Sequence, residues 1–406
     1  MREAADVVVA GGGLVGAAAA LVAARHGLSV VLLDRAEPRV RRGALGFDTR
    51  TVALNPSSAE LLSELGVFDA LAKEAFTRVY VWEEHGTRHI EFDASEVNRR
   101  ELGWIVEVSP TVDALWGALR REPQIEVCVG AEVSGVASDG DAVVVRAGEQ
   151  SIRASLLIAA DGGESAVRAL LGVDTERFAT GQSAIATIVQ TEKHHAHTAA
   201  QCFLHSGPIA LLPLPSGSGL ASDLSGSGLA RDPDHFVSVV WSQRDADAKA
   251  RLALDDAAFA REVERATESR LGRVLAVDAR ASFPLTQSLA QRFQPLPRVL
   301  LVGDAARVLH PLAGQGVNLG FEDVRGIRDI IRDAGRAALA DGDVWRALAR
   351  RRRVRGEIMV RAMDAFRALY ASSDPTLQWL RNVGVDLVNR TPLVKVELMR
   401  EALGLR

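Results

Sequence analysis

The stretch DVVVAGGGLVG, at Asp6–Gly16, decides the fold of this chain. After its aspartate comes a short apolar run, which is typical of a strand buried on both faces of a sheet. Glycines at Gly11, Gly13 and Gly16 follow in the pattern G-x-G-x-x-G. The alanine-rich residues Leu14–His26 then predict a helix. Strand, glycine turn and helix in this order predict the first half of a nucleotide-binding unit.

An acidic residue completes this unit. Leu28–Leu33 is a second apolar run, and Asp34 stands at its end, 18 residues beyond Gly16. A carboxylate there can accept hydrogen bonds from ribose hydroxyls, while the glycines let the backbone and the helix N-terminus approach a pyrophosphate. A glycine-rich turn that only packs in the core would leave Asp34 without a role. The stretch therefore predicts a dinucleotide site.

The composition excludes several other classes of protein. The 406 residues carry a formal net charge of -4, which gives no global positive field for a nucleic acid backbone, so we expect no nucleic acid partner. Two cysteines, Cys128 and Cys202, are too few for a disulfide scaffold, a thiolate zinc site or an iron–sulfur cluster. Val7–Ala24 is uncharged and long enough for a membrane helix, but its glycines favour a turn between two buried elements. We expect no membrane-spanning segment.

Two β-rich regions follow the opening unit. Short β-branched runs, beginning with Ile125–Val129, predict a meander that ends in a buried strand at Leu156–Ala160. Alternating apolar residues over 184–242 predict a sheet with one buried face. The sequence SGSGLA occurs twice within Ser216–Ala230, which we interpret as a flexible hairpin loop. From Asn318 onward the sequence predicts mostly helices.

A second motif, DGGESAVR at Asp161–Arg168, directly follows the predicted strand Leu156–Ala160. An acid and glycines at the carboxyl end of a buried strand place polar groups at the edge of the sheet where ligands bind. An Asp-Gly turn followed by a helix capped by Ser165 explains the same residues. The motif alone does not decide between these readings.

The third motif is the densest in the chain, GDAARVLHPLAGQGVNLG at Gly303–Gly320. Asp304 ends a buried strand, and Gly314 and Gly316 open a long helix. The start of a helix favours a ligand that develops negative charge, as reduced flavin does. A loop that merely enters a helix needs neither the acid nor the two glycines.

These three motifs, in this order, resemble the FAD-dependent aromatic hydroxylases of the single-component type. Asp48–Leu54 is similar to the DTR-x-x-AL segment of that family. Leu380–Val388, with Thr391-Pro392-Leu393 after it, resembles the tail of the ubiquinone-biosynthesis branch. The resemblance runs from about Asp6 to Leu405, apart from the repeated insert.

The resemblance implies an α/β fold in three parts. A Rossmann-like FAD-binding domain is expected beside a substrate domain built on a mostly antiparallel β-sheet, with a C-terminal helical extension. The expected ranges are 1–75, 100–182 and 286–340 for the discontinuous FAD-binding domain, 76–99 and 183–285 for the substrate domain, and 341–406 for the C-terminal helices.

Roles for individual residues also come from the resemblance. Gly11, Gly13 and Gly16 would hold the FAD pyrophosphate, and Asp34 would bond the adenosine ribose. Arg50 would lie beside the isoalloxazine ring, Asp161 near the cofactor and the approach of the pyridine nucleotide, and Asp304 at the ribityl chain. Pro311 would line the flavin pocket, and the backbone of Gly316, Val317 and Asn318 would face the pyrimidine edge. The chain departs from the family at Asp34, where Glu is usual, and at Arg307, where His is common.

The implied activity is that of an oxidoreductase, a FAD-dependent monooxygenase that uses NAD(P)H and O2 to hydroxylate a phenolic ring, with a ubiquinone precursor as the expected substrate. Only one G-x-G-x-x-G is present, so NADH or NADPH would bind transiently as co-substrate. We identify no catalytic base in the sequence. Two alternatives stay open: a flavin hydroxylase of a soluble phenol or polyketide, and a non-catalytic flavin-binding subunit of a biosynthetic assembly.

Partners are less defined by the sequence. The expected substrate is a small aromatic molecule, with or without a prenyl chain. Residues 341–406 contain 13 Lys and Arg against 8 Asp and Glu, with Arg350–Arg353 at the centre. These helices could contact the inner membrane or a biosynthetic complex, although a solvated helix face explains them too. We expect a cytoplasmic protein and leave peripheral membrane attachment and a homodimer open.

Three histidines, His194, His195 and His197, form a small cluster. Neutral imidazoles bind metal ions, but acidic residues are few nearby in the sequence, and the flanking residues predict a loop between strands. We therefore expect no metal site.

Overall fold

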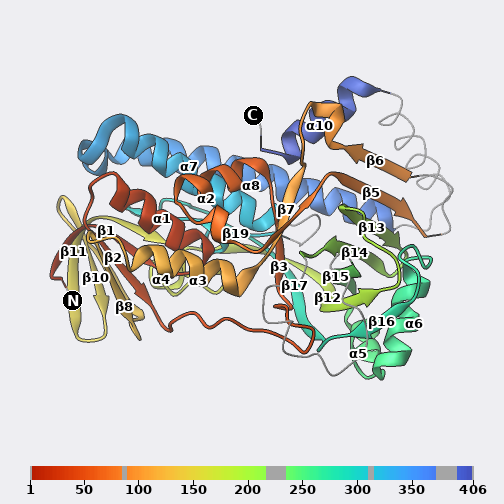
Figure 1. Cartoon of the computed structure of the whole chain (residues 1–406). Helices are drawn as coiled ribbons and strands as arrows, with labels where there is room; N and C mark the ends of the chain where they lie inside the picture. The colour runs from red at the N-terminus through yellow and green to blue at the C-terminus, as the bar shows by residue number, and fades with distance from the viewer. Residues whose placement is uncertain (1, 85–88, 216–234, 310–314, 372–390, 405–406) are drawn as a thin grey trace.

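The computed structural model describes residues 2–84, 89–215, 235–309, 315–371 and 391–404. Over these ranges the chain forms two lobes, each built on a large sheet, and long helices run beside both (Figure 1). Four features of the sequence analysis lie outside the described residues, namely the Ser216–Ala230 insert, Pro311, Gly314 and the tail segment Leu380–Val388.

A seven-stranded sheet forms the centre of the first lobe. Its strands lie in the order β8-β2-β1-β11-β10-β9, and β18 pairs with β11 beside that path. Neighbours from β8 to β11 are parallel, as is the β11–β18 pair, and β9, β10 and β11 form an antiparallel meander. The strands are β1 (Ala4–Ala10), β2 (Val30–Asp34), β8 (Ile125–Val129), β9 (Val133–Asp139), β10 (Ala142–Ala147), β11 (Gln150–Ala159) and β18 (Val299–Leu301).

The predicted meander is confirmed for three strands and wrong for one. Strand β8 does not join the meander but lies parallel to β2 at the edge of the sheet. It follows helix α3 (Val108–Leu119), and a strand that returns to a sheet through a helix enters it in parallel. The short β-branched run is the same in either arrangement, so the sequence pattern could not separate them.

Helix α1 (Leu14–Arg25) is buried on nearly every side. It packs on the sheet and contacts both α3 and α7 (Gln315–Ala334). Its residues from Gly16 to Ala24 are all buried, and the small alanine side chains let strands and helices approach closely. A larger side chain here would overpack the core and cost about 1–3 kcal/mol. The helix ends where predicted, and the uncharged stretch Val7–Ala24 is strand, turn and helix.

A nine-stranded sheet forms the second lobe. Its order is β19-β17-β12-β15-β14-β13-β5-β6, and β16 pairs with β12 beside that path. Every pair is antiparallel except β13–β5. The strands are β5 (Arg78–Glu83), β6 (His89–Asp93), β12 (Thr175–Thr191), β13 (Thr198–Leu204), β14 (Gly207–Pro213), β15 (Phe236–Arg244), β16 (Val274–Val277), β17 (Ala281–Ala290) and β19 (Arg307–Val308).

Helices α5 (Asp245–Leu252) and α6 (Asp256–Ala266) cover one face of this sheet (Figure 1). Phe259 of α6 and Trp241 of β15 lie fully buried between the helices and the strands. The side chain of Asp255 caps α6 by accepting a hydrogen bond from the backbone of Ala258. The mostly antiparallel second sheet that we expected is confirmed.

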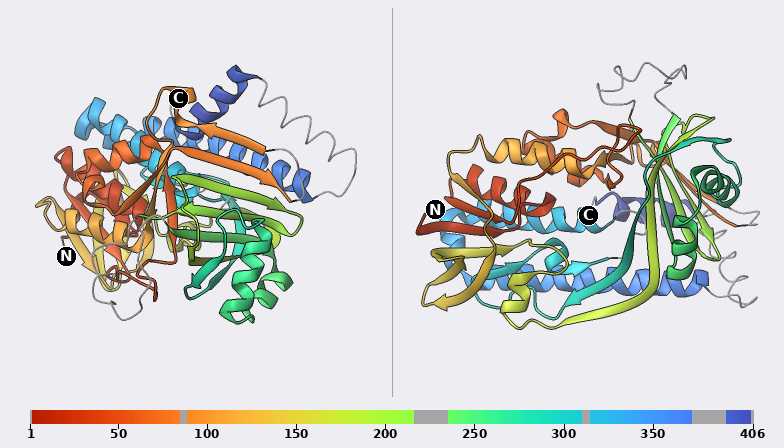
Figure 2. Two further views of the ribbon diagram at one scale, coloured as in Figure 1. Left: turned by 45° about the vertical axis from the view of Figure 1, so that its right-hand side comes forward. Right: turned by 90° about the horizontal axis from the view of Figure 1, so that it is seen from below.

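Strands β12 and β17 reach from one lobe toward the other (Figure 2). The expected domain boundaries, after residues 182 and 285, fall inside these two strands. We propose that the two domains are divided along them, because each strand runs from the Thr175–Ala290 pair, at the end nearer the first lobe, into the body of the second sheet. A paired two-strand connection is stiffer than a loop would be.

Short strands and helices complete the structure. A three-stranded antiparallel sheet has the order β3-β7-β4 and sits beside the second lobe. Helix α8 contacts β18 of the first sheet, β17 of the second sheet and helix α7. The remaining elements are β3 (Thr51–Leu54), β4 (Lys73–Phe76), β7 (Gly103–Glu107), α2 (Pro56–Glu64), α4 (Ala166–Leu170), the 3-10 helices η1 (Phe68–Ala70), η2 (Ala94–Val97), η4 (Gly303–Ala305) and η6 (Gly335–Ala340), and the helices α8 (Gly342–Ala371) and α10 (Pro392–Ala402).

The expected fold class is confirmed: a Rossmann-like α/β lobe, a mostly antiparallel second sheet and a helical C-terminal region. Among the described helices, none is both long enough and apolar enough to cross a membrane.

Candidate functional site

The glycine turn between β1 and α1 is shaped by close packing on one side and open space on the other. A Cβ atom at Gly11, where φ is +96°, would lie 2.5 Å from the carbonyl oxygen of Ala160. One at Gly16 would lie 1.9 Å from the carbonyl oxygen of Gly11. A Cβ at Gly13 would meet no described atom within 4 Å. The turn therefore offers the N-terminus of α1 and its unpaired N–H groups to that open side.

Trp116 of α3 fixes the remaining glycine of the turn. Its Nε1 donates to the carbonyl oxygen of Gly12 at 2.7 Å, and a Cβ at Gly12 would lie 2.7 Å from the indole ring. Trp116 is fully buried. This residue was not predicted, because in the sequence it is only one more apolar position of a predicted helix.

Asp34, at the end of β2, lies against the same turn. Its Oδ2 accepts the N–H of Gly12 at 2.6 Å, and its Oδ1 accepts the N–H of Ala36 at 3.0 Å. The carboxylate is therefore held at the carboxyl end of the parallel strands, beside the glycine turn. This is the position at which an acid can bond a ribose.

The second motif reaches the turn from β11. The Cα atom of Asp161 is 2.8 Å from the place where Gly11 would carry a Cβ. Asp161 also begins α4: its Oδ1 accepts from Ser165 Oγ at 2.6 Å, and its Oδ2 accepts from the backbone N–H of Val167 at 3.0 Å. Ser165 caps the helix by accepting the N–H of Arg168. The Ser-capped helix is confirmed. The motif also lies beside the glycine turn, and a contact of Asp161 with a ligand stays a prediction.

Arg168 joins the second motif to the third. This side chain is buried, and burial lowers the pKa of its guanidinium. Nη1 donates to the carbonyl oxygen of Ala305 at 2.9 Å, and Nη2 donates to that of Gly163 at 2.6 Å. The two turns are thus tied by one side chain, a link across 137 positions that the sequence does not signal.

Asp304 and Arg50 influence each other across the site. The Asp304 side chain is accessible to solvent, although the protein that surrounds it partly desolvates the carboxyl and raises its pKa. The guanidinium groups of Arg307 and Arg50 oppose this shift. Gly303 packs near Val15 of α1, with 3.2 Å between the Val15 side chain and a Cβ built on Gly303. The third motif therefore lies beside the glycine turn.

Arg307 forms a buried ion-pair network that we call the Arg307 network, made of Arg307, Asp323, Arg352 and Glu322. Nη1 and Nη2 of Arg307 donate to the two carboxylate oxygens of Asp323 at 2.9 and 3.2 Å. Arg352 of α8 donates to Asp323 at 2.6 Å and to Glu322 at 2.8 Å. Burial alone would raise the pKa of Asp323, but the two guanidinium groups outweigh it and hold that pKa below its usual range.

The same network anchors the third motif. Asp323 accepts the backbone N–H of Gly303 at 2.9 Å, and Arg307 Nη2 donates to the carbonyl oxygen of Leu319 at 2.6 Å. The departure from the family's usual His at position 307 thus has a structural explanation: the longer arginine reaches a carboxylate on α7. Its partner Asp323 was missed in the sequence.

Asn318 holds the first turn of α7 against the segment after β3. Its Oδ1 accepts the N–H of Asn55 at 3.0 Å and the hydroxyl of Ser58 at 2.7 Å. Its Nδ2 donates to the carbonyl oxygen of Ala53 at 2.8 Å. A Cβ at Gly316 would meet no described atom within 4 Å. The side chain of Asn318 is thus a tether, while the helix start nearby keeps open space.

Arg50 stands on a loop fixed from both sides. Asp48 accepts the N–H of Arg50 at 3.0 Å and that of Ser109 at 2.8 Å, and the N–H of Val108 donates to the carbonyl oxygen of Arg50 at 2.9 Å. Glu107 in turn accepts the N–H of Asp48, and burial raises the pKa of Glu107. The backbone is held while the Arg50 side chain remains exposed.

The structure therefore brings most of the predicted residues to one region, and Pro311 lies outside the described residues. The convergence of a glycine turn, a strand-end acid and a helix start defines the class: an α/β dinucleotide-binding protein with a second, antiparallel sheet. Residues 4–334 match the FAD binding domain family, and the chain belongs to that family. It is a FAD-dependent aromatic-ring monooxygenase, with NAD(P)H as co-substrate.

Relatives along the whole length support this assignment. The chain is 34% identical to the 3-demethoxyubiquinol 3-hydroxylase of Escherichia coli, over 98% of each chain. It is 31% identical to the ubiquinone hydroxylase UbiL of Rhodospirillum rubrum, over 98% of this chain and 90% of that protein. The human ubiquinone biosynthesis monooxygenase COQ6 is also 31% identical, over 97% and 91% of the two chains.

Solved structures share the fold. The p-nitrophenol 4-monooxygenase PnpA of Pseudomonas putida superposes with a TM-score of 0.78 at 21% identity, covering 99% of each chain. The protein PqsL of Pseudomonas aeruginosa gives a TM-score of 0.73 at 20% identity, over 94% of this chain and 99% of that one. At these identities the likeness concerns the fold alone.

Proposed function

We propose that this monooxygenase hydroxylates the aromatic ring of a ubiquinone precursor. One observation carries the proposal: the chain matches the Escherichia coli 3-demethoxyubiquinol 3-hydroxylase over 98% of both lengths at 34% identity. The relatives from Rhodospirillum rubrum and human are also named for ubiquinone hydroxylation or biosynthesis. The substrate would be a phenolic ring, with or without a prenyl chain.

The proposed FAD site follows from the geometry of the turns. The open side of Gly13 and the start of α1 fit a pyrophosphate, which Gly11 and Gly16 allow by keeping the turn tight. Asp34 would bond the adenosine ribose and Asp304 the ribityl chain, since Asp34 ends the parallel strand β2 and Asp304 lies in η4, just after the parallel strand β18. The other proposed contacts are Arg50 beside the flavin ring, Asp161 near the approach of the pyridine nucleotide, Pro311 in the pocket, and the backbone of Gly316, Val317 and Asn318 at the pyrimidine edge.

The chain's own residues would orient the reactants and stabilise charge. Bound FAD supplies the acceptor for the hydride of NAD(P)H and the activation of O2. The N–H groups in the first turn of α7 and the Arg50 guanidinium favour negative charge on the ring that they face. The tether of Asn318 to Asn55, Ser58 and Ala53 keeps that helix start in place. If the second sheet keeps water out of the site, less of the O2 consumed would be released as hydrogen peroxide without hydroxylating the substrate.

Contact with a membrane is proposed for one face of α8. Val354 and Ile358, one helical turn apart, are 49% and 56% exposed, and exposed arginines at 350, 351 and 361 flank them. Basic residues around apolar ones suit the surface of an anionic bilayer, each charge contributing about 1 kcal/mol. A cytoplasmic protein attached peripherally to the inner membrane would meet a lipid-soluble substrate there. Flotation with phosphatidylglycerol vesicles should recover the wild type and lose V354S/I358S, whereas equal recovery of both would dismiss this surface.

The function is tested by reduction and reoxidation of the purified yellow protein. We expect a prenylated phenol to accelerate anaerobic reduction by NADH or NADPH, and O2 then to give a product heavier by one oxygen atom. Stronger turnover of an unprenylated phenol or a polyketide would favour a soluble substrate instead. NAD(P)H oxidation without hydroxylated product from any phenol would favour a non-catalytic flavin-binding subunit. Sedimentation of the same sample would settle whether it is a homodimer.

A further inference from the structure

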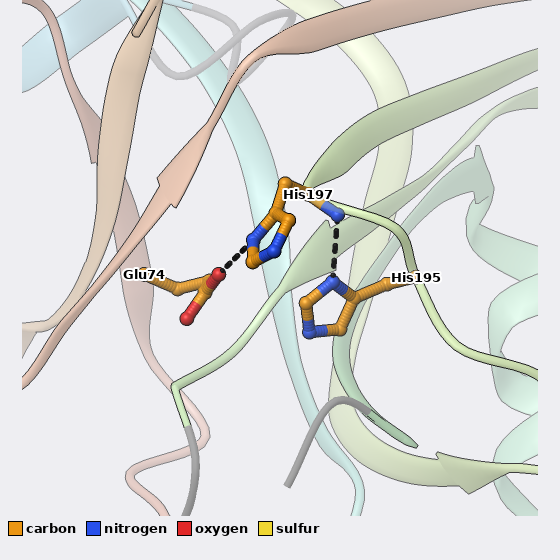
Figure 3. A group of neighbouring side chains, drawn as sticks. All are labelled: Glu74, His195 and His197. Carbon is orange, nitrogen blue, oxygen red and sulfur yellow. Dashed lines mark hydrogen bonds and ion pairs between the residues drawn. The ribbon is translucent and has the colours of Figure 1, made fainter. Parts of the chain in front are cut away.

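The loop between β12 and β13 carries a cluster that none of the three motifs includes. His195 and His197 lie on this loop, and Glu74 on β4 meets them from the three-stranded sheet (Figure 3). Acidic residues are scarce near these histidines in the sequence. The fold supplies one from more than 120 positions away.

The three side chains are close enough to share an ion. One donor atom of each lies within 4.8 Å of the donor atoms of the other two. His197 Nδ1 is 2.6 Å from Glu74 Oε1, and the backbone N–H of His197 donates to His195 Nδ1 at 3.1 Å. Two imidazoles and one carboxylate therefore converge on one place (Figure 3).

The backbone of the loop is shaped to bring the two rings together. Ala196 and His197 take φ values of 49° and 50°, the left-handed region that residues with a side chain rarely adopt. Thr198 supports this turn, since its N–H donates to the carbonyl oxygen of His195 and its hydroxyl to that of Ala196. An unusual backbone at two successive positions is a common mark of a functional loop.

Burial and charge also suit a cation. The Glu74 side chain is only 12% exposed and His195 is 2% exposed, whereas the His197 side chain is 52% exposed and leaves a route from solvent. A divalent ion would lower the cost of keeping this shielded carboxylate charged.

We propose that Glu74, His195 and His197 bind one divalent transition-metal ion, with Zn²⁺ as the probe. Two nitrogens and one oxygen are a usual ligand set for this ion, which takes a fourth ligand from water. Donor atoms around a tetrahedral zinc lie about 3.3 Å apart. The donor atoms of the three side chains lie within 4.8 Å of one another, so rotations of these side chains would have to bring them to that spacing.

The ion would join two parts of the chain. The carbonyl oxygen of His197 already accepts the N–H of Thr77, which links the loop to the segment between β4 and β5. A metal held by β4 and by the start of β13 would strengthen this link, so binding should raise the Tm. This site is independent of the proposed hydroxylase function.

The test uses the full-length protein with its flavin, without a polyhistidine tag and after treatment with chelator. Titration calorimetry with ZnCl2 and elemental analysis should give about one zinc per chain, and Co²⁺ should give the visible absorption of a four-coordinate site. E74Q and H197N should each weaken binding about tenfold or more. Asn tolerates the left-handed backbone at 197, and the flavin spectrum reports that each variant is folded.

H194N is the matched control. His194 is a neighbour in sequence, but its ring packs on that of His235 with 4.2 Å between centroids, outside the cluster. This variant should bind zinc as the wild type does. Absence of binding by the wild type at micromolar zinc, or binding that E74Q and H197N leave unchanged, would overturn the proposal.

Discussion

Arg307 offers a direct test of how the third motif is supported. Its guanidinium, with the residue 3% exposed, bonds both carboxylate oxygens of Asp323, and Arg352 bonds one of them as well. Asp323 also accepts the N–H of Gly303, beside the proposed ribityl-binding Asp304. The substitution Arg307→Ala leaves the buried Asp323 with one guanidinium fewer and removes one of the two guanidinium donors to the carbonyl oxygen of Leu319, the other being Arg352.

The magnitude follows from the burial of the pair. Removing one partner of a buried ion pair costs about 3–5 kcal/mol. Because Arg352 stays bonded to Asp323, we expect the lower end, about 3 kcal/mol. With an unfolding entropy of about 2 cal/mol/K per residue, this loss lowers the Tm of the 406-residue chain by about 3–4 °C. Retention of FAD should fall too, since the anchor of Gly303 is loosened.

Circular dichroism during heating gives the Tm, and the visible spectrum after gel filtration gives the FAD content. R351A is the matched control, because Arg351 is an exposed arginine one residue before Arg352, and its Tm should stay within about 1 °C of the wild type. R307H, with the residue common in the family, should lie between R307A and the wild type. An R307A protein that melts with the wild type and keeps all its flavin would refute this view of the Arg307 network.

Four further substitutions test other parts of the site. G13A places its methyl group in open space, so this variant should fold but bind FAD at least about tenfold more weakly. The methyl group of G16A collides with the backbone, so this variant should give less soluble protein. Flavin titration and circular dichroism distinguish the two effects. D304A should lose FAD on purification, and a variant isolated with full flavin content would contradict the proposed ribityl contact. The pKa of Glu107 is raised in the folded state, so the wild type loses stability as the pH rises through that folded-state pKa. E107Q should therefore raise the Tm at pH 8, but not at a pH below the unfolded-state pKa of about 4.3. Melting curves across this range check the sign, and a benefit that is equal at both ends would count against a protonation effect.

The sequence predicted the parts of the fold that local pattern determines. The glycine turn, helix α1, strand β2 and the antiparallel second sheet all follow from short apolar runs and from glycine placement. Short strands such as β3, β4 and β7 were not predicted, because four or five residues carry too little periodicity. The place of β8 was wrong, since pairing partners depend on the path of the chain through α3.

Residues that act through space were the ones missed. Trp116, Arg168 and Asp323 each bond a motif from a distant segment. Nothing in their local sequence marks them, because the sequence is the same whether an indole or a guanidinium faces solvent or bonds a buried carbonyl. A departure such as Arg307 was visible in the sequence, but its meaning depended on a carboxylate one helix away.

Helix α8 has a mechanical consequence for turnover. Its 30 residues form a rod of about 45 Å that touches both large sheets and is bonded to α7 through Arg352. Moving the lobes apart would break the contacts of α8 with the two sheets and expose the carboxylate of Asp323 to solvent. We therefore expect reactants to enter and leave through movements of smaller segments, without a change in the distance between the lobes.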